Sequence, residues 1–172
     1  YEGEYACLLE SLPPKKRGNA LITLLTENCP HWNDSGLYHE EKVFFYKRAQ
    51  ILVNDLYLGF QGDSFGAFDD IASLTMFADN LVPHVFFCEG VLGYSDSLKK
   101  QIQEQSFFNS YSEAEVEIRA SAIVAVEKIC HFWLEKQEKG FFPCMFDVYL
   151  WNSGHQEIYR KTPKHLTKTF FY

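Results

Sequence analysis

The chain lacks an excess of positive charge. Its 16 Lys and Arg residues stand against 23 Asp and Glu, which gives a formal net charge of −7. Proteins that bind nucleic-acid polymers draw much of their affinity from lysine and arginine contacts that release counterions from the phosphate backbone. The composition therefore argues against a polymer-binding role. A single small nucleotide remains a suitable ligand, because it needs only a local cationic patch.

Metal-binding motifs are also missing. The six His residues show no HExxH spacing, and the five Cys residues contain no CxxC pair. Zinc sites usually show such spacings, so we expect neither a metal nor another cofactor. An odd number of widely separated cysteines favours reduced, intracellular thiols.

No apolar run approaches the length of a membrane-spanning helix, and the N-terminus carries no signal peptide. These absences predict a cytoplasmic protein without a membrane partner. Tyr1 is an unusual first residue for a natural protein. We therefore expect residues 1–172 to form a single domain that is the central and C-terminal part of a longer protein.

Apolar and aromatic residues are abundant, at 47% and 17% of 172 residues. That content is enough for one compact domain with a substantial core. Apolar positions recur mostly at helical spacing and strand-like alternation is rare, so the predicted fold is all-α. The expected helices span residues 18–27, 40–60, 69–79, 82–92, 95–105, 112–139 and 143–151.

Several boundary residues support these helices. Asp69 and Asp70 suit the first turn of the third helix, and Ser95 suits an N-cap. Ser112 and Glu115 have the spacing of a capping box at the start of the longest helix. The Gly-containing loop at residues 62–66 lacks the order of a phosphate-binding P-loop, so a nucleoside-triphosphate site is not expected.

Asp79 is the first candidate for chemistry. It follows the apolar stripe of Ile71, Leu74 and Phe77 and is expected at a helix C-terminus, where the helix dipole disfavours a carboxylate. A carboxylate fixed there can stabilise an oxocarbenium-like sugar cation and activate a water. The alternative is that Asp79 merely ends a helix.

Cationic and aromatic residues supply candidate ligand contacts. Lys47 and Arg48 lie inside a helical apolar pattern and point about 100° apart, so one of them is expected to face a given site. Either can hold a phosphate, or both can be cations extending from a half-buried helix. Phe77 and Tyr46 can sandwich a base, although core packing is the simpler explanation for Phe77.

A charged group at the start of the longest helix is expected to be structural. Glu115, Glu117 and Arg119 have the spacing of a ladder of ion pairs on one exposed helix face. We expect them to form a solvated surface rather than a site.

Several long strings appear in a fixed order: VFFYKRAQILVNDLY, DDIASLTMFAD, GVLGYSDSL, SEAEVEIRASAIVAVE and a closing TFFY. Together they make the chain resemble the queuosine 5′-phosphate N-glycosylase/hydrolase family over nearly its whole length. The resemblance implies a mostly helical fold similar to helix-hairpin-helix DNA glycosylases. It also implies metal-free hydrolysis of queuosine 5′-monophosphate to queuine and ribose 5-phosphate, with Asp79 as the catalytic carboxylate and Lys47 near the sugar-phosphate.

The chain departs from the family pattern after Asp79. Family members typically have Tyr-Arg directly after that Asp and Gln after the next Pro, whereas this chain has Asn80, Leu81 and His84. The loss of an Arg beside the catalytic carboxylate is expected to weaken the grip on the substrate or to change the base that is released.

The sequence therefore predicts a nucleotide N-glycosidase whose partner is a small nucleotide, queuosine 5′-monophosphate. Asp79 is the predicted catalytic residue, and Lys47, Arg48, Phe77 and Asn80 are the predicted substrate contacts. Two alternatives stay open. One is a degenerate member that binds queuine or its nucleotide without cleaving it; the other is a helical interaction module that docks through its basic tail, residues 160–168. The oligomeric state is left open.

Overall fold

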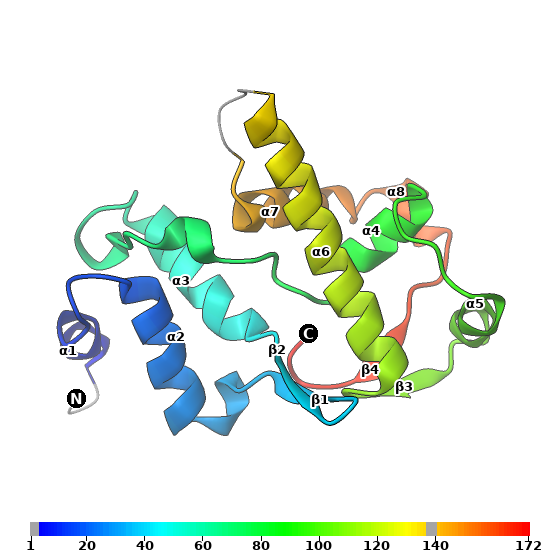
Figure 1. Cartoon of the computed structure of the whole chain (residues 1–172), viewed down its shortest axis with the longest axis horizontal. Coiled ribbons are helices and arrows are strands. Elements are labelled where there is room, and N and C mark those ends of the chain that lie inside the picture. The colour runs from blue at the N-terminus through cyan, green and yellow to red at the C-terminus, as the bar shows by residue number, and fades with distance from the viewer. Residues whose placement is uncertain (1–3, 137–140) are drawn as a thin grey trace.

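A computed structural model describes residues 4–136 and 141–172 (Figure 1). Eight α-helices occur in these two ranges: α1 (Tyr5–Glu10), α2 (Arg17–Asn28), α3 (Lys47–Gly59), α4 (Val82–Cys88), α5 (Asp96–Gln103), α6 (Glu113–Glu135), α7 (Pro143–Ser153) and α8 (Glu157–Arg160). Three short 3-10 helices are η1 (Pro30–Trp32), η2 (Ser64–Gly66) and η3 (Ile71–Ser73). No helix in the described ranges is long and apolar enough to cross a membrane.

The prediction of an all-α fold is wrong, because four short strands form two small sheets within residues 4–136 and 141–172. Strand β1 (Ser35–Tyr38) pairs antiparallel with β2 (Glu41–Phe44), with Tyr38 opposite Glu41. Strand β3 (Phe107–Asn109) pairs in parallel with β4 (Leu166–Lys168) and so ties the tail to the middle of the chain. The fold mixes helices and strands, and the structure gives no support to the expected likeness to helix-hairpin-helix DNA glycosylases.

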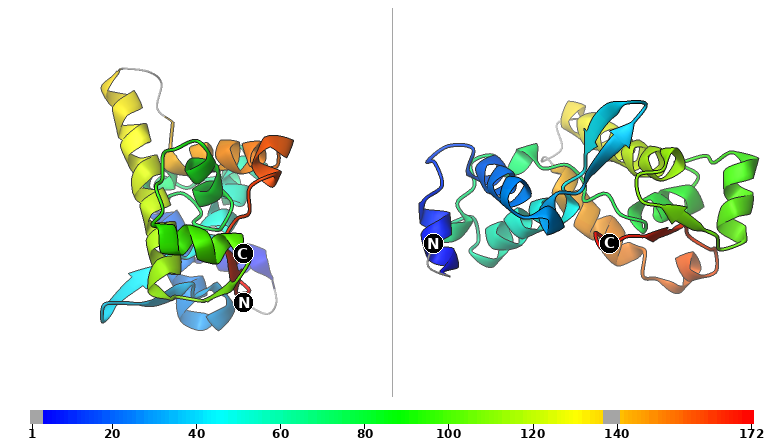
Figure 2. Two further views of the ribbon diagram at one scale, coloured as in Figure 1. Left: turned by 90° about the vertical axis from the view of Figure 1, so that its right-hand side faces the viewer. Right: turned by 90° about the horizontal axis from the view of Figure 1, so that it is seen from below.

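The first hairpin replaces the beginning of the helix that was predicted over residues 40–60. His39 and Glu40 both have positive φ angles, 46° and 69°, as the two central residues of a type I′ turn require. Neither is Gly or Asn, so the sequence carries no signature of the turn. Tyr46, with a φ of 48°, then redirects the chain into α3. Figure 2 shows the β1–β2 hairpin projecting from the middle of the molecule.

The helix predicted over residues 69–79 is also absent. Only η3 is helical here, and residues 74–78, which we call the extended segment, form neither helix nor strand. Asp70 accepts hydrogen bonds from the backbone N–H groups of Gly18 and Asn19 at 2.8 and 2.9 Å. The carboxylate therefore satisfies the start of α2 instead of capping a helix of its own. Further along, the backbone N–H of Thr75 donates to the side chain of Gln50 on α3, which holds the segment extended.

The other predicted helices are largely confirmed. Helices α2, α4, α5 and α7 fall where they were expected, and the hydroxyl of Ser95 caps α5 by accepting from Leu98 N–H at 3.3 Å. Ser112 precedes α6, but the predicted capping box is incomplete because the hydroxyl of Ser112 caps nothing. The predicted end of this helix at Lys139 and Gly140 lies outside the described residues.

Buried apolar side chains form two clusters. One lies among α4, α6 and α7, and the other among α1, α2, α3 and η3. The extended segment before Asp79 contributes to both, with Met76 and Ala78 in the first cluster and Leu74 and Phe77 in the second. Asp79 thus directly follows the strip of chain that joins the two clusters. The helices of the second cluster lie on the left of Figure 1, and those of the first lie in its centre and on its right.

Candidate active site

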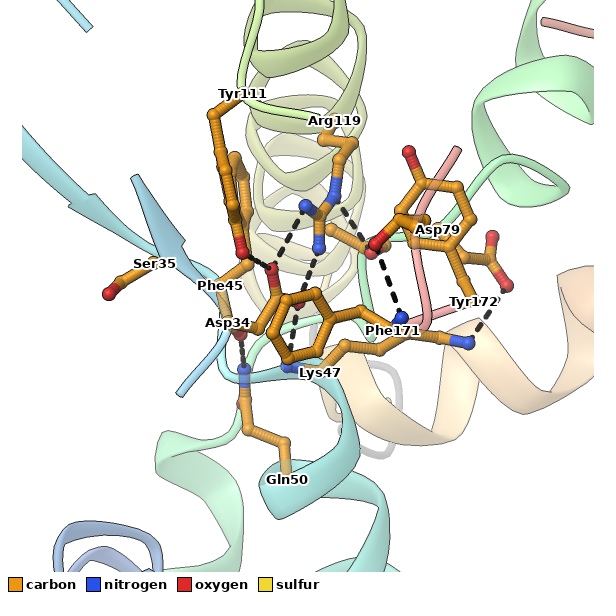
Figure 3. A network of polar contacts seen from close by, with 12 residues as sticks. Asp34, Ser35, Phe45, Lys47, Gln50, Asp79, Tyr111, Arg119, Phe171 and Tyr172 are labelled. Carbon is orange, nitrogen blue, oxygen red and sulfur yellow. Dashed lines mark hydrogen bonds and ion pairs between the residues drawn. The ribbon is translucent and has the colours of Figure 1, made fainter. Parts of the chain in front are cut away.

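Lys47 is the first residue of α3, where the left-handed turn at Tyr46 starts the helix. Its ammonium lies 3.5 Å from a carboxylate oxygen of Asp79, and the two side chains are 13% and 5% exposed (Figure 3). An ion pair this well shielded is screened much less than a surface pair. Two residues that the sequence predicted for one site, 32 positions apart, are therefore brought together.

Asp79 is held by the start of α4, not by the end of a helix as was expected. One of its carboxylate oxygens accepts from the backbone N–H groups of Leu81 and Val82 at 2.8 and 3.2 Å. The dipole at a helix N-terminus favours negative charge, so the carboxylate is placed where the helix stabilises it. The other oxygen is the one that faces Lys47. The side chain is therefore fixed at one oxygen and presents the second for chemistry.

Asp147 on α7 was not found by sequence reasoning. It is 4% exposed, and one oxygen accepts from Phe77 N–H at 3.0 Å. Burial, followed by the negative charge of Asp79, raises the pKa of Asp147 to about 8, so the carboxyl group is mostly neutral at pH 7. A single acid inside the apolar string PCMFDVYLW was the signal that could have identified it.

Lys47, Asp79 and Asp147 line one pocket of about 280 Å³, near the lower end of typical small-molecule sites. We call it the Asp79 pocket. Asn54 and Asp55 on α3 add polar groups to its wall, and burial raises the pKa of Asp55.

The rest of the wall of the Asp79 pocket is apolar. It is formed by Ile51, Phe77, Val148 and Trp151, from α3, the extended segment and α7. Flat apolar surfaces of this kind suit a nucleobase, whose faces stack on aromatic rings. One pocket thus combines a surface for a base with charged groups for a sugar.

A second cleft, of about 340 Å³, lies between α4, α8 and residues 162–166, with Gly154 and His155 after α7 also in its lining. Its lining includes His84, His155 and Lys164 but no carboxylate. The chemistry expected of Asp79 needs a carboxylate, so the candidate active site is the Asp79 pocket.

Two predicted substrate contacts lie outside the Asp79 pocket. The guanidinium of Arg48 donates to the carbonyl of His31 at 3.4 Å and lies 5.4 Å from the ring of Trp32. The side-chain amide of Asn80 donates to the carbonyl of His165 at 3.4 Å. The lining includes Phe77 but not Tyr46, so the structure does not form the expected base sandwich from these two rings.

Two of the residues that depart from the family pattern, Leu81 and His84, belong to the second cleft. Neither of them lines the Asp79 pocket. A ring nitrogen of His84 lies 2.9 Å from the carbonyl oxygen of Tyr159, and burial lowers the pKa of the imidazole. The side chains at these positions therefore change the second cleft rather than the lining of the Asp79 pocket.

The expected surface ladder at the start of α6 is mostly buried. Glu115 and Arg119 are each 1% exposed, whereas Glu117 is exposed and accepts from Tyr38. The guanidinium of Arg119 binds Asp34 through two nitrogens and Glu115 through one. We call Asp34, Glu115 and Arg119 the Arg119 cluster. The exposed-ladder prediction failed because the partner, Asp34, lies 85 residues away and cannot be found from local spacing.

Comparisons with known proteins agree with the resemblance seen in the sequence. The profile of the family described as "Queuosine salvage protein" matches residues 1–172. A protein of Dictyostelium discoideum named "Queuosine 5′-phosphate N-glycosylase/hydrolase" is 38% identical over 161 residues, covering 94% of this chain and 50% of the relative. Relatives with the same name from Sphaerobacter thermophilus and Mus musculus are 39% and 36% identical, covering 89% and 88% of this chain.

Those two relatives are each covered over 47% of their own length. The chain therefore spans about half the length of the curated relatives that it matches. The match of the family profile over all 172 residues leads to one conclusion: this chain belongs to the queuosine salvage protein family.

Proposed function

We propose that the chain carries the active site of an N-glycosidase that hydrolyses queuosine 5′-monophosphate. The observation that carries the proposal is the Asp79 pocket, in which a fixed carboxylate, a lysine and a neutral carboxyl group meet beside an apolar wall. The name of the relatives supports the choice of substrate. A net charge of −7 supports a free nucleotide rather than a nucleic-acid polymer.

Asp79 acts on the sugar in this proposal. As the bond between the anomeric carbon and the base nitrogen breaks, positive charge develops on the ribose. The second oxygen of Asp79, which no backbone group holds, stabilises that charge and accepts a proton from the attacking water. The water oxygen bonds to the anomeric carbon, and ribose 5-phosphate is formed.

Asp147 acts on the base. Because its pKa is raised to about 8, the carboxyl group still carries its proton at neutral pH. It therefore donates a hydrogen bond or the proton to the leaving base. A 7-deazapurine lacks the ring nitrogen at position 7, so the proton must go to another acceptor of the base. Two carboxyl groups with opposite protonation states, as at other acid–base sites, then divide the work.

Lys47 and the apolar wall hold the substrate. The ammonium of Lys47 offsets the cost of burying the charge of Asp79 and has further N–H donors for oxygens of the sugar-phosphate. Phe77 and Trp151 offer faces for the base. Arg48 and Asn80 lie outside the pocket, and each would need to rearrange in order to reach a substrate.

The two alternatives gain no support from the geometry. Asn80 and Leu81, which suggested a degenerate member, do not line the Asp79 pocket: Leu81 lines the second cleft, and the side-chain amide of Asn80 donates to the carbonyl of His165. The basic tail that suggested a docking segment is folded back, because β4 pairs with β3. The five cysteines are free thiols, which supports a reducing compartment, and we propose the cytoplasm.

Incubation of the chain with queuosine 5′-monophosphate, followed by mass detection of free queuine, tests the proposal. We expect release of queuine, with Asp79→Asn as the inactive control. A correctly folded chain that binds the nucleotide but releases no queuine would overturn the hydrolytic function and support the binding alternative.

A further inference from the structure

Arg119 does not line the Asp79 pocket, but it connects the two chain segments that supply Asp79 and Lys47 to it. Its Nε donates to the carbonyl oxygen of Ala78 at 3.0 Å, and Ala78 directly precedes Asp79. Its other two nitrogens bind both carboxylate oxygens of Asp34. A planar guanidinium can bind a carboxylate through two nitrogens while its third nitrogen binds elsewhere, whereas an ammonium donates from a single nitrogen.

Asp34 in turn holds the start of α3. Its backbone carbonyl accepts from Phe45 and Tyr46 N–H at 2.9 and 3.1 Å, and its carboxylate accepts from Lys47 N–H at 3.4 Å. Asp34 is fully buried, and its carboxylate also accepts from the hydroxyl of Tyr111 at 3.0 Å. The turn that projects Lys47 is therefore fixed by a side chain that Arg119 holds.

Aromatic rings fix the guanidinium of Arg119 from two sides. It lies 3.9 Å from the centre of the ring of Phe45 and 5.0 Å from that of Tyr172. Tyr172 also donates to Glu115 at 2.6 Å, and Glu115 binds Arg119. Figure 3 shows this arrangement, with the guanidinium between Asp34 and the chain that leads to Asp79.

From this geometry we infer that Arg119 is a positioning residue, which sets the spacing of Lys47 and Asp79 by binding Asp34 and the carbonyl of Ala78 together. The inference rests on the proposed function. It assigns a role in the reaction to a residue that is 1% exposed and does not line the pocket. The distance between catalytic groups matters because a displacement of about 1 Å can lower a rate by about 100-fold.

Arg119→Lys is the test variant, because it keeps the charge but has three N–H donors on one nitrogen and cannot make the four hydrogen bonds that Arg119 makes. A buried ion pair that loses a partner also destabilises a fold. Val126→Ala, at a fully buried apolar position on the same helix, therefore serves as the control for lost stability alone. If Arg119→Lys does not fold, Asp34→Asn weakens the same link while it keeps one acceptor oxygen for Arg119 or Lys47.

The first readout needs no catalysis. Reductive methylation followed by peptide mass analysis reports how accessible each lysine is. We expect Lys47 to be protected in the unsubstituted chain and in Val126→Ala, with exposed Lys100 as the internal reference. In Arg119→Lys or Asp34→Asn, the reactivity of Lys47 should rise toward that of Lys100. Continued protection of Lys47 in both network variants would overturn the inference, whether or not the chain hydrolyses the nucleotide.

The second readout is a double-mutant cycle on hydrolysis of queuosine 5′-monophosphate. Arg119→Lys should lower kcat by about 10–100-fold while KM changes by less than about threefold. In a Lys47→Ala background the same substitution should have a much smaller effect, because Arg119 then has no lysine to position. A loss of equal size in both backgrounds would mean that Arg119 does not act through Lys47. Absence of turnover in the unsubstituted chain would count against the proposed function alone.

Discussion

The Asp79 pocket and the Arg119 cluster are both built from buried charges, but they differ in how those charges are satisfied. Every nitrogen of the Arg119 guanidinium has an oxygen partner, and two aromatic rings cover it. In the Asp79 pocket, one oxygen of Asp79 faces a lysine in a cavity, and the neighbouring Asp147 is kept neutral by burial.

This difference indicates a structural role for the Arg119 cluster and a chemical role for the Asp79 pocket. A buried polar network whose members are all paired rigidifies its surroundings. A group whose pKa is displaced inside a cavity keeps the capacity to exchange a proton, and such groups gather at functional sites. Substitutions in the Asp79 pocket should therefore change turnover more than stability, and the reverse should hold at the edge of the Arg119 cluster.

Asp79→Asn should have the largest effect on turnover. Removal of the charge that stabilises the sugar cation is expected to lower kcat by more than about 100-fold. Circular dichroism should show an intact fold, because Asn can still accept from Leu81 and Val82, while thermal unfolding should show a moderate loss of stability because Lys47 loses its ion-pair partner. Asp96→Asn, at an exposed helix position, is the matched control and should leave turnover unchanged. Turnover close to normal in Asp79→Asn would remove Asp79 from the mechanism.

Asp147→Asn should lower kcat/KM by about 10–100-fold, as expected for the loss of a general acid. It should also change the pH profile. In the unsubstituted chain, kcat/KM should fall as the pH rises through about 8, because Asp147 loses its proton there. The Asn variant should lack that fall. If kcat/KM of Asp147→Asn still falls as the pH rises through about 8, the fall must be caused by the titration of another group.

The same carboxyl group gives a stability test. Its pKa rises from 3.8 to about 8 on folding, so between these values the folded state holds a proton that the unfolded state has released. The free energy of unfolding should therefore fall as the pH rises from about 4 to 8, and this contribution should vanish in Asp147→Asn. Urea unfolding at several pH values measures it. A stability difference between the two chains that does not vary with pH would contradict the burial of a neutral Asp147.

Lys47→Ala should have a smaller effect, near 10-fold in kcat, because it removes a neighbour of Asp79 rather than the acting oxygen. If Lys47 also contacts the phosphate, the monophosphate should lose more binding free energy than the nucleoside, by about 1–3 kcal/mol. Titration calorimetry with both ligands measures the difference. Equal losses would restrict Lys47 to its ion pair with Asp79.

Tyr172→Phe should have the smallest effect on turnover and should mainly lower the free energy of unfolding. It removes the 2.6 Å hydrogen bond to Glu115 but keeps the ring beside Arg119. We expect a loss of about 1–2 kcal/mol in the free energy of unfolding. Tyr5→Phe, at a side chain that is 79% exposed, is the control and should change nothing. A rate loss larger than that of Lys47→Ala would erase the distinction between pocket and cluster.

The sequence predicted part of the site because that part is local. Lys47, Phe77 and Asp79 lie in strings that resemble the family, and the structure places all three in one pocket. Asp147 was missed because its role depends on packing against residues 70 positions away, through Phe77 N–H. The Asp34–Arg119 pair was missed for the same reason.

The errors in the fold have equally local causes. Residues 40–46 were assigned to a helix because short apolar runs fit more than one period, and the turn at His39 and Glu40 lacks Gly or Asn. The segment after Asp70 was assigned to a helix because an Asp before an apolar stripe suits an N-cap. In the structure, that carboxylate binds the start of α2 instead. Helices with local caps, such as α5, were predicted correctly.

The position of Tyr172 has a consequence for synthesis of the chain on the ribosome. Asp34 binds Arg119, which is translated 85 residues later, and Arg119 is covered by the ring of Tyr172, which is translated a further 53 residues later. Chains are made at about 5–20 residues per second, so several seconds pass between the synthesis of Arg119 and that of Tyr172, whose ring covers the guanidinium. A nascent chain stalled before β4 should therefore leave the Arg119 cluster open to water and vulnerable to proteolysis, and should close it only after residues 166–172 emerge.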